Sequence, residues 1–216
     1  TCILLGAGAE DIMEKNVVLK PQRLMDARQL VIAGLLVGIT VFLGLSGYGF
    51  IPLFTINATI LHVPTIIGAI VAGPKVGCMV GFFFGLFSFI QSFRSPAIML
   101  QFAQQYNVLY GFLICIVPRV TIGFIAWWIY KHIPGRLLIR ATVTSVLTTL
   151  LHTGLFLSFF YMLVGAPFAT HKGMSLDAFR MMLEGVAVTN GLPEAALAGV
   201  IVAPIVIALT HAHIIQ

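Results

Sequence analysis

Long apolar stretches dominate this sequence and limit the folds that it can adopt. A helix that spans a membrane needs about 20 mainly apolar residues, within a range of about 17 to 25. Six stretches meet this requirement, the second only just, and they do not alternate as the strands of a membrane barrel would. They predict six transmembrane helices, at roughly 27–46, 57–73, 76–93, 107–130, 138–164 and 186–210.

The composition agrees with a membrane protein. Of the 216 residues 59% are hydrophobic and only 9% are charged, and the mean hydropathy is +1.04. A soluble domain has about 25% charged residues, so polar side chains here are too few to cover a water-soluble globule. We therefore expect an all-α membrane protein with a single domain at 27–212. It would follow an N-terminal cytoplasmic segment, 1–26, of which 1–12 could be an extension of other origin.

The positions of basic residues predict the orientation. Lysines and arginines concentrate in the cytoplasmic loops of membrane proteins, and this rule, rather than nucleic-acid binding, accounts for the net charge of +5. With the N-terminus inside, eight basic residues lie on the inner side and three on the outer side, so both termini are expected to be cytoplasmic. The inner set is Lys15, Lys20, Arg23, Arg28, Lys75, Lys131, Arg136 and Arg140, and the outer set is Arg94, Lys172 and Arg180.

The cysteines and several missing motifs argue against some classes of function. The three cysteines form no CxxC pair and no Cys/His cluster, so we expect neither a disulfide framework nor a zinc site. The sequence has no GxxxxGK[ST] phosphate loop, no HExxH and no GxSxG. We expect no enzymatic activity and no cofactor in this chain. The alternatives are an intramembrane enzyme that uses His62 or His152, and a secondary transporter coupled to protons through Glu194.

Two charged residues lie at membrane depth, where polar groups are costly and therefore indicate function. Arg119 follows Pro118 near the middle of the fourth stretch, and Glu194 lies in the sixth, one helical turn after Asn190. Pro118 has no N–H, so it leaves one backbone carbonyl of its helix free. The two charges either contact a substrate or form a structural ion pair with each other, and both interpretations can hold.

Further polar side chains predict a small-ligand site that opens outward. His62 lies near the outer end of the second stretch, and Ser145, Thr149 and His152 form one polar stripe on the fifth. Small-ligand sites place a few polar groups on an apolar lining, although such groups also hydrogen-bond between helices without any ligand. The candidate substrate-binding residues are Asn57, His62, Arg94, Asn107, Tyr110, Arg119, Thr149, His152, Asn190 and Glu194.

Glycines recur at four-residue spacing in two of the stretches. Gly34 and Gly38 lie in the first, and Gly77, Gly81 and Gly85 lie in the third. Glycines at this spacing let another backbone approach closely. We expect tight helix packing within the chain, or, for the first stretch, a face that meets a partner subunit.

Five segments in this order give the sequence a family resemblance. They are "ATILHVPTIIGAIVAGPKVG", "GFFFGLFSF", "RSP", "VPRVTIGFIAWWIYK" and "TNGLPEAALAG". With them the chain resembles the substrate-binding S components of energy-coupling factor (ECF) vitamin transporters from about residue 28 to 208. The resemblance implies six helices, both termini inside, and a vitamin site near the outer face that the loop between the first two helices covers.

The same resemblance implies partners in a bacterial plasma membrane. They are a transmembrane coupling protein (the T component) and two cytoplasmic ATPases that use ATP, and transport would occur by toppling of the S component in the bilayer. Small residues of the first helix would meet the coupling protein, here Ala33, Gly34 and Gly38, with glycines where the family more often has alanines.

The quoted segments most resemble the pantothenate-specific members of the family. Pantothenate is an anion whose carboxylate would suit Arg94 or Arg119, and a charge-assisted contact with arginine is among the stronger hydrogen bonds. Its hydroxyls and amide would suit Asn57, His62 and Asn190. Pyridoxine and cobalamin importers share much of the pattern, so these vitamins are the alternatives.

Overall fold

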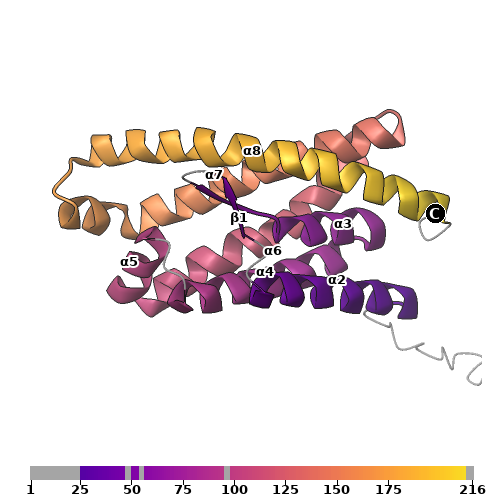
Figure 1. Ribbon diagram of the computed structural model, residues 1–216, viewed down its shortest axis with the longest axis horizontal. Coiled ribbons are helices and arrows are strands. Elements are labelled where there is room, and N and C mark those ends of the chain that lie inside the picture. The colour runs from indigo at the N-terminus through magenta and orange to yellow at the C-terminus, as the bar shows by residue number, and fades with distance from the viewer. Residues whose placement is uncertain (1–24, 47–49, 54–55, 95–97, 213–216) are drawn as a thin grey trace, which may run out of the picture.

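The protein is an elongated bundle of helices that run mainly along its long axis (Figure 1). The computed structural model describes residues 25–46, 50–53, 56–94 and 98–212, and their side chains except at 50–58, 94 and 98. A short antiparallel hairpin of β1 and β2 follows α2. The elements are α2 (Ala27–Ser46), β1 (Phe50–Leu53), β2 (Ile56–Thr59), α3 (His62–Ala72), α4 (Pro74–Arg94), α5 (Ile98–Tyr106), α6 (Val108–His132), α7 (Leu137–His171) and α8 (Leu176–His211).

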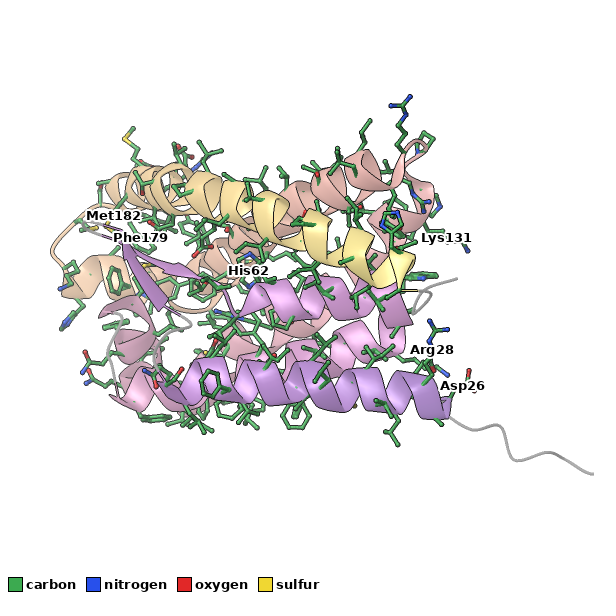
Figure 2. All side chains as sticks on the ribbon, turned by 45° about the vertical axis from the view of Figure 1, so that its right-hand side comes forward. Asp26, Arg28, His62, Lys131, Phe179 and Met182 are labelled. Atoms are coloured by element: carbon green, nitrogen blue, oxygen red, sulfur yellow. The ribbon has the colours of Figure 1, made fainter. Side chains whose placement is uncertain are left out.

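The two ends of the bundle are easily told apart. α2 begins and α8 finishes at the same end, here called the chain end, and α5 lies at the opposite end, here called the α5 end (Figure 1). In Figure 2, Arg28 and Lys131 lie towards the chain end, whereas Phe179 and Met182 lie towards the α5 end. His62 lies between them, at an intermediate level of the bundle.

Most of the predicted spans are present as helices. Within the part of the chain that the structure describes, five helices are long and apolar enough to cross a membrane, namely α2, α4, α6, α7 and α8. They overlap five of the six predicted stretches and confirm a multi-pass helical membrane protein. The sixth, α3, is apolar but has only 11 residues.

The prediction of a helix at 57–73 is wrong for its first five residues. Residues 56–59 form β2 instead, and α3 begins only at His62. The physical reason is Pro64, which has no N–H to bond the carbonyl of Ile60 and whose ring would clash with that carbonyl in a longer helix. Proline is tolerated in a first helical turn, so α3 starts just before it and ends at Ala72, directly before Gly73, where φ is +92°.

Helix also forms in segments that lie between the predicted spans. α5 forms within the segment after Arg94, α7 continues to His171, and α8 already begins at Leu176. Side-chain packing explains the extension, because the rings of Phe168 and Phe179 pack with their centroids 5.1 Å apart. This buried contact offsets the helix-breaking tendency of Pro167, which lies inside α7.

Three apolar clusters form the core, a large one near each end of the bundle and a small one of Leu61, Phe84 and Ile122. The chain-end cluster joins α2, α3, α4, α6, α7 and α8, and the α5-end cluster joins α5, α6, α7 and α8. On α7 the buried polar residues from Ser145 to His152 lie between Ala141 of the first cluster and Leu157 of the second. Arg119 on α6 and Glu194 on α8 occupy the same intermediate position along their helices. A polar layer, in which Phe84 of the small cluster contacts Arg119 and His152, thus lies between the two large clusters.

The glycines of α4 bring its backbone against that of α6, which confirms close packing within the chain. A methyl group at Gly85 would lie 2.8 Å from the carbonyl oxygen of Cys115, and one at Gly81 would collide with the carbonyl oxygen of Arg119. Any side chain there would force the two helices apart. By contrast, Gly34 and Gly38 on α2 are exposed, and a methyl group added at either would meet no atom within 4 Å.

Candidate functional site

The polar layer holds four ionisable side chains that come from four different helices. His62 is the first residue of α3, His152 lies on α7, Arg119 on α6 and Glu194 on α8. All four are buried, with exposed fractions of 1%, 5%, 7% and 8% respectively. Polar groups buried this deeply need hydrogen-bond partners, so the partners of each one indicate what the site can bind.

Arg119 is held by a carbonyl group that Pro118 leaves free. In a regular helix the carbonyl of Ile114 would accept the N–H of residue 118, but proline has none. The Arg119 Nη1 donates to this oxygen at 2.7 Å. The guanidinium carbon lies 4.6 Å from the ring centroid of Phe156 and 5.5 Å from that of Phe84, at cation–π distance. The Nε–H remains buried without a partner among the described residues.

His62 and His152 stack against each other. Their ring centroids are 6.2 Å apart and the ring planes differ by 26°. All four ring nitrogens are buried without a hydrogen bond to any described residue. Phe84 joins the two histidines to Arg119, because its ring also lies 5.8 Å from that of His152.

Glu194 is engaged by the end of the hairpin and not by the arginine. Its Oε1 accepts the backbone N–H of Thr59 at 2.9 Å and the Thr59 hydroxyl at 3.0 Å. The structure describes both charged side chains and no ion pair joins them, so the structural ion pair considered for Glu194 and Arg119 is not formed. The site therefore has one cation with a free N–H beside two imidazoles with free nitrogens.

This arrangement suits a small anion that also carries hydroxyl or amide groups. A buried donor without a partner costs about 1–3 kcal/mol, and here several such groups from three helices lie close together. A ligand carboxylate would accept from the Arg119 Nε–H, and each neutral imidazole can donate through one nitrogen and accept through the other. The phenylalanine rings supply the apolar lining.

A comparison with protein families decides the class of this molecule. The family model described as "ECF transporter, substrate-specific component" matches residues 28–206. The chain is a substrate-specific (S) component of an ECF transporter. It is also 28% identical, over 74% of its length and 81% of the relative's, to a protein from Lactococcus lactis subsp. cremoris (strain MG1363) described as "Pantothenic acid transporter PanT". The family and the relative are transporter components rather than enzymes.

The other residues predicted for the site of this S component lie in different settings. Thr149 is buried near His152, but its hydroxyl donates to the Ser145 carbonyl at 2.8 Å. Asn107 is exposed and caps α6 by accepting the N–H of Leu109. Tyr110 is half-buried towards the α5 end, and Asn190 is half-buried on α8. The side chains of Asn57 and Arg94 lie outside the described residues, so their roles stay predictions.

Three contributors to the site of the S component are not predicted from the sequence. Phe84 and Phe156 are ordinary apolar residues in sequence, and only the fold places their rings against the Arg119 guanidinium. Thr59 stands out in sequence only as a polar neighbour of His62. A signal for Phe84 exists, since it lies between Gly81 and Gly85, the two glycines that bring α4 against α6 beside Arg119.

Proposed function

We propose that this S component is the substrate-capture subunit of an ATP-driven ECF importer for pantothenate. Membership of the family and similarity to a relative described as a pantothenic acid transporter support the transport of this vitamin. The observation that carries the proposal is the buried Arg119, which has a free Nε–H and, among the described residues, no carboxylate partner of its own.

The chemistry of pantothenate fits the groups that the site leaves free. Its carboxylate would bind the Arg119 guanidinium, and its hydroxyl and amide groups would bind His62 and His152. Asn57 and Asn190 are further candidates for the polar part of the ligand. Pyridoxine has no carboxylate and cobalamin is far larger, so the buried cation favours pantothenate over both.

The proposed orientation places the chain end in the cytoplasm. The two described ends of the chain lie together, and Arg28 and Lys131 lie towards the same end (Figures 1 and 2). Basic residues favour the cytoplasmic side. With α3 as a sixth, partial span, the α5 end would face outward. Delivery would then require a transmembrane coupling protein and two ATPases, in a bacterial plasma membrane, with toppling as the proposed movement.

Calorimetric titration of the detergent-purified chain tests the cargo directly. Pantothenate, pyridoxine and cobalamin are titrated in turn into folded protein. We expect saturable binding of pantothenate at nanomolar to low-micromolar affinity and no saturation with the other two. Binding of pyridoxine or cobalamin in its place would reassign the cargo, and binding of none of the three by folded protein would contradict the proposal.

A second prediction concerns the exposed glycines of α2. Replacing both Gly34 and Gly38 with leucine should leave pantothenate affinity unchanged, because both are exposed and an added Cβ at either meets no atom within 4 Å apart from its own stretch of helix. The same change should prevent co-purification with the coupling protein if that protein packs on this face. Ala33 is fully buried in the chain-end cluster and so does not belong to the exposed face. Intact complex formation by the double variant would place the partner elsewhere.

A further inference from the structure

The end of the hairpin is tied to α8 by one carboxylate. Thr59, the last residue of β2, donates both its backbone N–H and its hydroxyl to Oε1 of Glu194. The two residues are 135 positions apart in the chain, and Glu194 is 8% exposed. Hydrogen bonds to a charged acceptor are stronger than those between neutral groups, so this tie is a strong local link between hairpin and bundle.

The tie also fixes the position of a site residue. Only Ile60 and Leu61 separate Thr59 from His62, and the N–H of Val63 closes this turn by donating to the Ile60 carbonyl at 2.9 Å. The start of α3 is thus held at Thr59 on one side and by the packing of α3 on the other. Movement of Thr59 away from α8 would shift the His62 ring relative to His152.

Glu194 and Arg119 form their hydrogen bonds with different partners and not with each other. Thr59 supplies donors to the carboxylate, and the Ile114 carbonyl accepts from the guanidinium. A carboxylate without these donors would be drawn towards the nearby cation and would compete there with an anionic ligand. The contact with Thr59 therefore keeps Arg119 available.

We propose that Glu194 is a positioning residue that anchors Thr59, holds the hairpin against α8 beside the bound anion, and thereby slows release of that anion. In this role Glu194 acts through the hairpin and does not contact the ligand, in contrast to its predicted place among the substrate-binding residues. The inference rests on the proposed function, since the ligand whose release is measured is pantothenate.

Hydrogen exchange of the ligand-free protein tests the anchor without any ligand. Glu194→Ala should increase exchange of the backbone amides at 56–61, the segment that the carboxylate holds. Glu194→Gln keeps an acceptor oxygen without the charge, so its exchange at 56–61 should be faster than in the wild type and slower than in the alanine variant. The matched control is Glu184→Ala, which removes an exposed glutamate of the same helix that pairs with Arg180 at 3.1 Å. It should leave exchange at 56–61 unchanged.

Binding kinetics test the consequence for the ligand. In stopped-flow measurements with pantothenate, Glu194→Ala should accelerate dissociation roughly 10- to 100-fold, with an association rate within about threefold of wild type. Thr59→Val removes only the hydroxyl and should give a smaller acceleration. The double variant should dissociate no faster than Glu194→Ala alone, because both changes break one contact.

The outcomes separate the inference from the proposed function. If Glu194→Ala leaves hydrogen exchange at 56–61 unchanged, Glu194 does not anchor the hairpin. If exchange rises but the dissociation rate of pantothenate stays the same, the anchor does not slow release of the ligand. If Glu194→Ala does not fold, Thr59→Val alone decides both points. If neither wild type nor Glu184→Ala binds pantothenate, the proposed cargo is rejected, while hydrogen exchange still decides whether Glu194 anchors the hairpin.

Discussion

Replacing Arg119 with methionine is expected to lower pantothenate affinity at least about 100-fold, because a buried carboxylate would lose its charge-assisted hydrogen bonds. Methionine is apolar and flexible, so it can keep the contacts with Phe84 and Phe156 that the guanidinium now makes. Calorimetric titration of wild type and variant measures the loss. Arg119→Lys keeps the charge but not the planar guanidinium, so its pantothenate affinity should lie between those of the wild type and Arg119→Met.

Two controls show whether the loss reflects the ligand carboxylate. Arg180→Met removes an exposed arginine of α8, outside the site, and should bind like wild type. Pantothenol, in which a hydroxyl replaces the carboxylate, should bind wild type weakly and Arg119→Met about equally weakly. If the folded Arg119→Met variant binds pantothenate as well as wild type, the carboxylate lies elsewhere, and Arg94 becomes the leading candidate.

Replacing Gly81 with alanine should cost at least about 3 kcal/mol of stability, the upper part of the range for overpacked cores. The added methyl group would collide with the carbonyl oxygen of Arg119 and would lie 3.3 Å from Cγ2 of Thr65. A backbone oxygen cannot rotate away, so α4 and α6 must separate. The midpoint of thermal unfolding in detergent should fall by roughly 6–12 °C. Pantothenate affinity should also fall, because α6 carries Arg119.

The matched control for this prediction is another helical glycine with free space around it. An added Cβ at Gly154 on α7 meets no atom within 4 Å. Gly154→Ala should therefore leave the unfolding midpoint unchanged or raise it slightly, since alanine favours helix by about 1 kcal/mol over glycine. Equal behaviour of the Gly81 and Gly154 variants would show that α4 and α6 pack less closely than described.

The membrane spans and the polar residues at membrane depth can be predicted from the sequence, because both depend on short-range patterns. Five predicted stretches overlap the long helices, since apolar runs locate them, although α7 and α8 extend beyond the predicted bounds. Pro118 also predicts a free carbonyl, and the Ile114 oxygen is indeed where Arg119 donates. His62 and His152 are brought together in the same buried layer, as a polar site requires.

What the sequence does not reveal depends on contacts between distant parts of the chain. Thr59 and Glu194 are 135 residues apart, so no local pattern predicts that one binds the other. Phe156 looks like any lipid-facing aromatic until the fold places it over the guanidinium. The extra turns of α7 and α8 depend on the contact of Phe168 with Phe179, which forms only when the two helices lie side by side.

The unusual length of α7 and α8 has a consequence for the surrounding lipid. They have 35 and 36 residues, so each extends over about 53 Å at 1.5 Å per residue. The hydrocarbon layer is only about 30 Å thick. Part of the excess is polar, since the first turns of α8 carry Asp177, Arg180 and Glu184 and would extend beyond the hydrocarbon layer. Excess apolar length is relieved by tilting or by local thickening of the bilayer. A thinner membrane therefore favours a more inclined chain, so lipid acyl length becomes a variable that biases the resting tilt of this molecule.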